Sequence, residues 1–452
     1  MNDVRPFISE YQFIGILLCG ISIALVSLIS LIFNVSTIPF FFMLLSVLGI
    51  LLYIKKPLIF LALLIVIRMS LDSSSESISL TINTYSASLS QILGIGIASV
   101  GLISLIRFRR HLRSYPLNTP FLIIFLWGIL SIAFSISPIL GIQELLRFFS
   151  IWSIGFLAYA VVRSRDDVRT IFLAIFLSAL LPILFGIYQF INGIGLVDEN
   201  VSIPRIFGTF SHPNVFSLYL ATLSGITILF FLSFTKNLKE KIFTGGFLIL
   251  LSLTLLFTYT RIGWIALFLF LLLVALYRFR LALIPLILIP IILYAIIPPI
   301  HDRINESFQP TVDSSLTWRQ GLWHDNITFV LSDGNHLIYG YGMNTFPLVS
   351  ENIRGIKLGS NDSHNDYVKF FVEGGVIGLA IFLISLFLIG RLFFLASRST
   401  PESAIQSAFM LLLILFAVLE IAALSDNVFK NTPVQWIFFI TASILFALQK
   451  KK

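Results

Sequence analysis

The chain has 452 residues, of which 57% are hydrophobic and only 12% are charged. Soluble domains carry about twice that share of charged residues, so the composition excludes a soluble protein and indicates a membrane protein. The net charge of +8 is explained more simply by Lys and Arg in cytoplasmic loops than by nucleic acid, which we do not expect as a partner. The single cysteine, Cys19, excludes an intramolecular disulfide and a cysteine metal cluster.

Apolar runs recur along the whole chain. Several approach the roughly 20 residues that cross a bilayer as a helix, so we expect an all-α polytopic membrane protein whose residues 1–452 form a single integral-membrane domain. The first run is longer than the core of a signal peptide and lacks a small-residue cleavage site, so it is expected to remain as a span. About 14 transmembrane helices (12–14) are predicted, approximately at 13–33, 38–54, 58–71, 91–106, 119–136, 141–162, 170–190, 213–234, 242–258, 262–277, 281–298, 367–390, 403–424 and 433–449.

The connections between these runs alternate in charge. One set, together with Arg5, holds about twenty of the thirty Lys and Arg residues. The positive-inside rule then places this set, and both chain termini, in the cytoplasm. The other set holds the longer polar segments, 72–90, 192–212 and 299–366, so the last of these is expected to be a large loop on the outer face.

The large outer loop is expected to have structure of its own. Residues 315–331 have the periodicity of a helix whose apolar side chains share one face, namely Leu316, Trp323, Ile327 and Val330. Such a helix lies on the membrane or caps the bundle, although interfacial anchoring is the commoner role of tryptophans in such positions. Residues 340–346 contain two glycines and are expected to turn the chain back.

The stretch 359–378 runs from a polar loop directly into an apolar run, so it marks the point where a membrane helix reaches water. His364 stands at the start of that helix, beside Asn365, which favours an N-cap position, and Asp366, whose charge suits the helix dipole. An imidazole there can act as a base near neutral pH. The alternative is an interfacial histidine that caps the helix and has no chemistry.

Among the arginines outside the positive-inside set, three are candidates for a site: Arg205, Arg261 and Arg319. Arg205 precedes a span that Ser211 or His212 can cap, and Arg261 separates two apolar runs that have almost no loop between them. An arginine near hydrocarbon costs about 2.5–3.5 kcal/mol at the membrane centre and usually faces a cavity or a partner. The alternatives are snorkelling to the interface and pairing with a carboxylate.

An ordered set of motifs in roughly the second half of the chain resembles the O-antigen ligase and O-antigen polymerase family. The motifs are Arg205-Ile-Phe-Gly with Pro213-Asn214, Thr258-Tyr-Thr-Arg261, Arg319 with Trp323, Gly340-Tyr-Gly-Met-Asn-Thr-Phe346, and Ser363-His-Asn-Asp-Tyr with Glu373-Gly-Gly-Val-Ile-Gly378. The resemblance implies a GT-C-like glycosyltransferase of the bacterial inner membrane. The number of spans expected for this chain is above the dozen common among the ligases, which leaves the first spans without a family role.

The resemblance also implies the substrates and the site. The enzyme would take a glycan from an undecaprenyl diphosphate carrier at the periplasmic face, among membrane lipids, and pass it to a glycan or lipid-glycan acceptor. Arg205 and Arg261 would bind the diphosphate and His364 would activate the acceptor hydroxyl, with three further candidates for substrate binding in Arg319, Asn214 and Asn365.

The expected chemistry suits these residue types, because the arginine fork matches phosphate oxygens and a neutral imidazole takes up a proton near pH 7. We expect a direct displacement that inverts the anomeric centre, with no cofactor and no metal. Ligase, polymerase and protein glycosylase share this site logic, so the three remain open.

Rival classes make different predictions. A lipid-glycan flippase or other transporter would place charged or broken helices near the membrane midplane, whereas this chain concentrates its polar residues outside. A non-catalytic assembly protein would use the large loop, with Trp318 and Trp323 as anchors, to bind a partner. A metal-dependent membrane glycosyltransferase is weakened because no Asp-x-Asp pair occurs in the outer loops.

Overall fold

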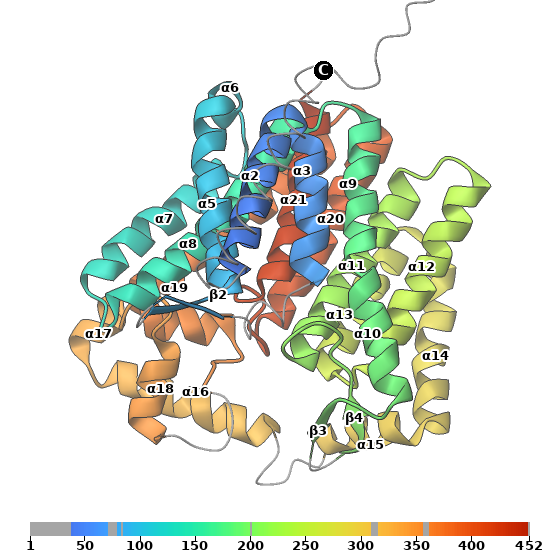
Figure 1. Cartoon of the computed structure of the whole chain (residues 1–452). Coiled ribbons are helices and arrows are strands. Elements are labelled where there is room, and N and C mark those ends of the chain that lie inside the picture. The colour runs from blue at the N-terminus through green and yellow to red at the C-terminus, as the bar shows by residue number, and fades with distance from the viewer. Residues whose placement is uncertain are drawn as a thin grey trace, which may run out of the picture.

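The computed structural model describes residues 38–70, 79–82, 85–198, 201–308, 315–355 and 361–450. The expected first span at 13–33, and Cys19 within it, lie outside the described residues. Within the described part most residues belong to helices, and the helices pack side by side as a bundle (Figure 1). The protein is therefore an all-α polytopic membrane protein, as predicted.

The helices follow one another with short connections. They are α2 (Ile38–Lys55), α3 (Pro57–Ser70), α5 (Leu89–Arg107), α6 (Arg109–Leu112), α7 (Asn118–Ala133), α8 (Pro138–Val161), α9 (Arg165–Ser178), α10 (Leu180–Ile191), α11 (Pro213–Ser233), α12 (Leu238–Phe257), α13 (Arg261–Arg278), η1 (Arg280–Ala282), α14 (Leu283–Ile296), α15 (Pro298–Phe308), α16 (Ser315–Leu331), α17 (Gly334–Tyr339), α18 (Phe346–Arg354), α19 (Asp366–Ser399), α20 (Ser403–Ala422) and α21 (Thr432–Gln449). Two antiparallel hairpins accompany them, β1 (Ser79–Ile82) with β2 (Tyr85–Ser88) and β3 (Leu196–Asp198) with β4 (Val201–Arg205).

Each expected run from 38–54 onward coincides with one or two of these helices, but the total of 14 spans is not confirmed. Among the described residues, eight helices are long and apolar enough to cross a membrane, or nine if a bent pair counts as one span. That bent pair falls at the expected end of the run 281–298. The chain turns by 102° between Arg280–Ile296 and Pro298–Glu306, because Ile297 is extended and Pro298 restricts the residue before it.

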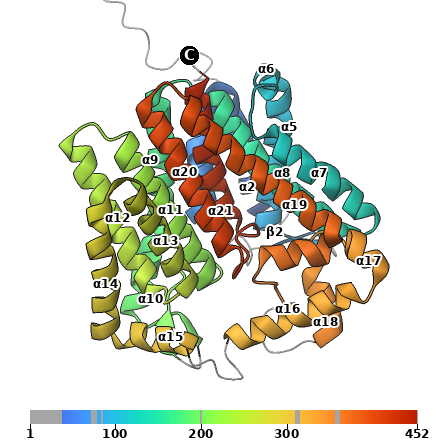
Figure 2. The same cartoon turned by 180° about the vertical axis from the view of Figure 1, so that it is seen from behind.

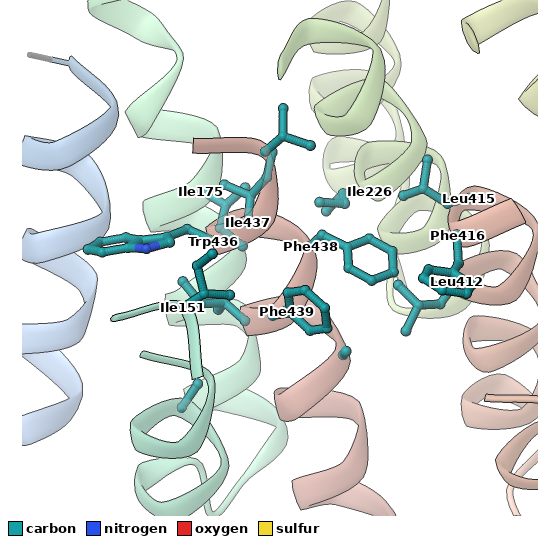
Figure 3. Close-up of a cluster of buried hydrophobic side chains, with 14 of the residues drawn as sticks. Ile151, Ile175, Ile226, Leu412, Leu415, Phe416, Trp436, Ile437, Phe438 and Phe439 are labelled. Carbon is teal, nitrogen blue, oxygen red and sulfur yellow. The ribbon is translucent and has the colours of Figure 1, made fainter. Parts of the chain in front are cut away.

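The centre of the bundle is formed by α21, which is enclosed by α8, α9, α11 and α20. Trp436, Ile437, Phe438 and Phe439 of α21 are buried and point in different directions, Trp436 toward the blue helix on the left and Phe438 toward Leu412 and Phe416 of α20 (Figure 3). In a membrane protein, a helix that is apolar all round either packs among other helices, as α21 does, or faces lipid. By contrast, α14 has no buried residue and exposes isoleucine and leucine around its surface, as expected for a helix that faces lipid.

The two ends of the bundle differ. Figure 1 shows α6 and the C-terminal end of α21 at one end, and the hairpin β3–β4 with α15, α16 and α18 at the other. The connections expected in the cytoplasm and those expected outside thus lie at opposite ends. We call the end that carries β3, β4 and α15 to α18 the polar-loop end.

Helix α19 joins the polar-loop end to the bundle, and it runs beside α20 and contacts α7 and α17 (Figure 2). Its helical course is broken at Gly375, whose φ of 60° lies in the left-handed region that glycine adopts without a steric penalty. The break frees the carbonyl oxygens of Val372 and Glu373, which accept hydrogen bonds from the backbone N–H groups of Tyr341 (3.1 Å) and Gly342 (2.8 Å). The predicted turn at 340–346 is thereby fastened to α19.

Candidate active site

Arg205 is the last residue of β4, and its side chain is buried at the polar-loop end. Its guanidinium donates from Nε to the Thr258 carbonyl (3.3 Å) and from Nη2 to Thr260 Oγ1 (2.8 Å) and Asn214 Oδ1 (3.0 Å). Two of these partners belong to the short connection between α12 and α13, and the third lies in the first turn of α11. Arg205 therefore ties together three segments that are far apart in the sequence.

His364 lies just before the first turn of α19, where Asn365 is the N-cap residue and accepts from the Val368 N–H (3.1 Å). The backbone of His364 has φ 46°, which is uncommon for a residue other than glycine and often marks a functional site. The preceding Ser363 is held on both sides: its carbonyl accepts from Trp323 Nε1, and its hydroxyl donates to Asn427 Oδ1, each at 2.6 Å. The neighbours thus fix the strained backbone of His364.

Asp426, in the connection between α20 and α21, joins the histidine to the arginine. One carboxylate oxygen lies 3.5 Å from His364 Nδ1, and the other accepts from Asn214 Nδ2 at 2.7 Å. Since Asn214 also accepts from Arg205, a continuous chain of contacts runs His364–Asp426–Asn214–Arg205. Three residues that the sequence analysis singled out are therefore neighbours, and Asp426 is the link between them.

The Asp426 carboxylate is held ionised although it is buried. Burial alone would raise the pKa of this carboxyl, but hydrogen bonding to His364 and the charge of that imidazole lower it. With the added charge of Arg319 and the N–H of Asn427, the pKa of Asp426 falls to about 2. An ionised carboxylate only accepts hydrogen bonds, so the proton of a neutral His364 lies on Nδ1, and Nε2 keeps a lone pair for a substrate proton.

His212 lies beside Asn214, and the roles of its two ring nitrogens are the reverse of those in His364. It is the N-cap of α11, and its Nδ1 accepts from the Asn214 N–H at 3.1 Å. Burial, aided by the charge of Arg205, lowers the pKa of His212 to about 4, against the opposing effect of Asp426. The ring is therefore neutral at pH 7, and because Nδ1 accepts, Nε2 carries the proton and can only donate.

Arg319 reaches the site from α16. Its Nη1 donates to the Ser425 carbonyl at 2.6 Å, directly beside Asp426, while its buried Nε has no hydrogen-bond partner among the described residues. Burial lowers the pKa of Arg319, and the charge of Asp426 opposes that shift. The ring of Trp318, one residue earlier, lies edge-on to His364 with 5.8 Å between centroids. The predicted helix 315–331 thus covers the site.

Arg261 is the first residue of α13 and is partly exposed. Its Nη2 lies 3.8 Å from a carboxylate oxygen of Glu306 in α15, and Arg303 of the same helix donates from Nη1 to the other oxygen at 2.6 Å. Arg303 also donates from Nε to the Tyr259 carbonyl at 3.2 Å. Pairing with a carboxylate was one of the readings open for Arg261, and the structure realises it.

The alternating aspartates around His364 do not converge. Asp362 pairs with Lys430 at 2.5 Å, whereas Asp366 accepts from the Phe429 N–H at 2.8 Å. Within the part of the chain that the structure describes, no three His, Cys, Asp or Glu side chains form a group that could hold a metal ion. The side chain of Asn365, proposed for substrate binding, is engaged as the cap of α19.

A buried charge cluster of Glu144, Arg147, Lys369 and Glu373 supports the loop of Asp426 from within the bundle. Arg147 donates twice to the Glu144 carboxylate (2.7 and 2.8 Å), and Lys369 donates to it at 2.9 Å and lies 3.9 Å from Glu373. Arg147 also donates to the Phe429 carbonyl at 2.5 Å. Asp366 accepts from the N–H of Phe429, so side chains hold both backbone polar groups of Phe429. This residue is three positions from Asp426.

Sequence reasoning missed four residues of this region. Asp426 carried a signal, because it is an acidic residue in a short connection assigned to the outer side by the alternation of charge. His212 was recognised only as a cap. Arg303 and Glu306 lie in a polar stretch of the large loop, where nothing in the spacing separates them from solvated charges.

Residues 246–383 match the model of a family described as O-antigen ligase. The matched region extends from α12 into α19 and contains Arg261, Arg319 and His364, whereas Arg205 and Asp426 lie outside it. The match confirms the family resemblance that the motifs indicated. No curated protein matches the chain.

Proposed function

We propose that this chain, whose residues 246–383 match the model of a family described as O-antigen ligase, transfers a glycan from an undecaprenyl diphosphate carrier to an acceptor hydroxyl at the polar-loop end, facing the periplasm. A membrane protein that transfers glycans in polysaccharide assembly is what the family implies. The carrier, the residues and the course of the reaction are the proposal. The observation that carries it is the contact chain His364–Asp426–Asn214–Arg205.

The donor is proposed to lie with its diphosphate against the arginines. Arg205, Arg261 and Arg319 come from three segments, yet all lie at the polar-loop end near Asp426 or the α12–α13 connection. As the bond from the anomeric carbon to the diphosphate oxygen breaks, negative charge grows on the diphosphate. Fixed guanidinium groups stabilise that charge without reorganising, which is a main source of catalysis.

His364 is proposed to act on the acceptor. Its Nε2 lone pair receives the proton of the acceptor hydroxyl while that oxygen forms its bond to the anomeric carbon. Asp426 stabilises the imidazolium that results and keeps the ring in the required tautomer. His212 has the opposite tautomer, and its Nε2–H is proposed to donate to an oxygen of the lipid-linked glycan. A direct displacement of this kind inverts the anomeric centre and needs neither cofactor nor metal.

Deleting the gene and examining the surface polysaccharide on a gel tests the function. Full-length chains that stay unattached indicate a ligase, and single repeat units indicate a polymerase. A glycan pattern identical to that of the parent strain would overturn the proposal.

The proposed orientation has its own test, since the proposal requires the segment 299–366 to lie outside and both termini to lie in the cytoplasm. In a Cys19→Ser background, single cysteines are introduced as Ser332→Cys at the polar-loop end and Asn237→Cys at the opposite end. We expect an impermeant thiol reagent to label Ser332→Cys in intact cells and Asn237→Cys only after permeabilisation. The reverse pattern would overturn the site assignment.

A further inference from the structure

The carboxylate of Glu306 is shared by two arginines at the polar-loop end. One oxygen accepts from Arg303 at 2.6 Å, and the other lies 3.8 Å from Arg261. The side chain of Arg303 is 5% exposed, that of Glu306 14% and that of Arg261 23%. The contact is thus tight on its buried side and loose on the side that reaches solvent.

These arginines surround one short segment. Arg205 donates to the carbonyl of Thr258, and Arg303 donates to the carbonyl of the next residue, Tyr259. Arg261 follows two residues later, as the first residue of α13. Tyr259 itself has φ 47°, a left-handed conformation that is strained for a bulky residue. The connection between α12 and α13 is therefore held in an unusual shape that gathers three guanidinium groups around it.

Two guanidinium groups that bind a carboxylate can also bind a phosphoryl group, because both anions offer negatively charged oxygens as acceptors. Both anions present two or more oxygens to planar forks of N–H donors. A phosphoryl group, with more oxygens and more charge, makes the stronger contact. The Glu306 side chain therefore stands where one phosphoryl group of a lipid diphosphate would be bound.

We propose that Arg303 is a further donor-binding residue, and that Glu306 occupies the phosphoryl subsite between Arg261 and Arg303 until a lipid diphosphate displaces it. The inference rests on the proposed function and deepens it. The contacts run from His364 through Asp426 and Asn214 to Arg205. The subsite of Arg261 and Arg303 lies on the far side of Arg205 from His364. It therefore takes the phosphoryl group that is next to the lipid, while Arg205 faces the one next to the sugar.

If the donor displaces Glu306, removing the charge of Glu306 should strengthen donor binding, whereas most substitutions in a binding site weaken it. In Glu306→Gln the competing charge is gone, so the donor has less to displace and binds more tightly, by about three- to tenfold from the magnitude of partly buried ion pairs. A purely structural Glu306 would weaken binding when removed. Arg303→Ala removes half of the subsite and is expected to weaken binding by about tenfold or more.

The experiment measures binding of undecaprenyl diphosphate without glycan to the purified full chain in detergent micelles. Asp302→Asn is the matched control, because Asp302 is in the same helix, is 60% exposed and pairs with His301 rather than with an arginine. It changes the net charge by the same amount and is expected to bind like the wild type. If Arg303→Ala does not fold, Arg303→Lys and the Glu306→Gln comparison still give the answer.

A double variant sharpens the test. In an Arg303→Ala background, Glu306→Gln is expected to lose most of its gain, because the two changes act on one subsite. Glu306→Gln binding no more tightly than Asp302→Asn would overturn the inference while leaving the proposed function intact. A wild-type chain that does not bind undecaprenyl diphosphate would overturn the proposed function, and the inference with it.

Discussion

Two groups of buried charges in this protein are held in different ways. In the cluster of Glu144, Arg147, Lys369 and Glu373, within the bundle, the cations are bound by carboxylates. At the polar-loop end, the described hydrogen bonds of Arg205 and Arg319 go to carbonyl, hydroxyl and amide oxygens. Neutral oxygens orient a guanidinium through hydrogen bonds, although the nearby Asp426 carboxylate offsets part of the charge of Arg319. The first arrangement suits a structural role, and the second suits the binding of an anion.

The comparison also separates the effects expected from mutation. Breaking an internally balanced cluster leaves an uncompensated charge inside the bundle, and therefore costs stability. Removing an arginine that is oriented for a ligand costs binding or turnover instead. Each prediction below tests one side of that contrast, beginning with the largest effect.

Glu144→Gln is expected to cost about 3–5 kcal/mol of stability, because Arg147 and Lys369 then share only the more distant Glu373. Thermal unfolding of the purified protein measures this loss, with the exposed Glu351→Gln as the control. Adding Arg147→Met to Glu144→Gln should restore part of the stability, since Lys369 then pairs with Glu373.

The double variant of Glu144→Gln and Arg147→Met should nevertheless transfer glycan more slowly than the wild type. The Phe429 carbonyl has then lost its hydrogen bond from Arg147, so the loop of Asp426 is held less firmly. If Glu144→Gln unfolds like the wild type, the cluster is not the structural element described. If the double variant regains full turnover, the charge cluster does not position Asp426.

Arg261→Ala is expected to lower glycan transfer by about 10²–10³-fold, the usual effect of removing one donor that stabilises developing charge. Arg261→Lys should recover only part of this, since an ammonium lacks the planar fork. Arg278→Ala, at the far end of the same helix, is the control and should leave turnover unchanged. Normal transfer by Arg261→Ala at normal membrane levels would remove this residue from the mechanism.

His212 should make stability depend on pH. Its pKa is about 4 in the folded protein and 6.5 when exposed, so below pH 6.5 the unfolded chain takes up a proton that the folded chain refuses. Stability from this residue is therefore present above pH 6.5 and falls between pH 6.5 and 4, by about 2 kcal/mol at pH 5.

His212→Asn tests this, because asparagine is also a favoured N-cap but does not titrate. Melting temperatures measured from pH 7.5 to 5 should fall less steeply in the variant than in the wild type. Parallel curves would mean that His212 does not remain neutral in the folded protein. Asp426 does not interfere, since its lowered pKa acts only below about pH 4.

Excess EDTA is expected to have no effect on transfer by the purified enzyme, because the arginines are proposed to neutralise the diphosphate themselves. Transfer assays with and without EDTA, followed by Mg²⁺ or Mn²⁺, measure this. Loss of turnover that either ion restores would refute the arginine-and-histidine mechanism.

Local patterns explain which parts of the structure the sequence could predict. The helix at 315–331 was predicted with its observed bounds. Its buried face is rotated slightly from the expectation: Leu322, Asn326 and Val330 are buried, while Trp323 and Ile327 are half-buried. The Asn326 amide donates to the Leu322 carbonyl of its own helix at 2.9 Å, whereas its Oδ1 has no hydrogen-bond partner among the described residues.

The candidate site was predictable where a residue type is unusual in its setting, as for Arg261 between two apolar runs and His364 at the start of one. The partnership of His364 with Asp426, and that of Arg261 with Glu306, depends on contacts between segments far apart in the chain. Neither periodicity nor charge alternation specifies such contacts. The bend after Ile296 lies at the expected end of the run 281–298, but its angle of 102° depends on backbone geometry that an apolar pattern does not specify.

The division of labour between arginines and histidine is tested most directly by measuring donor binding and glycan transfer on the same His364→Ala protein. We predict wild-type affinity for the undecaprenyl-diphosphate-linked glycan, with transfer lowered by about 10²–10⁴-fold, the usual contribution of a general base. If His364→Ala instead loses donor binding, the histidine belongs to the phosphate site and another group must receive the hydroxyl proton.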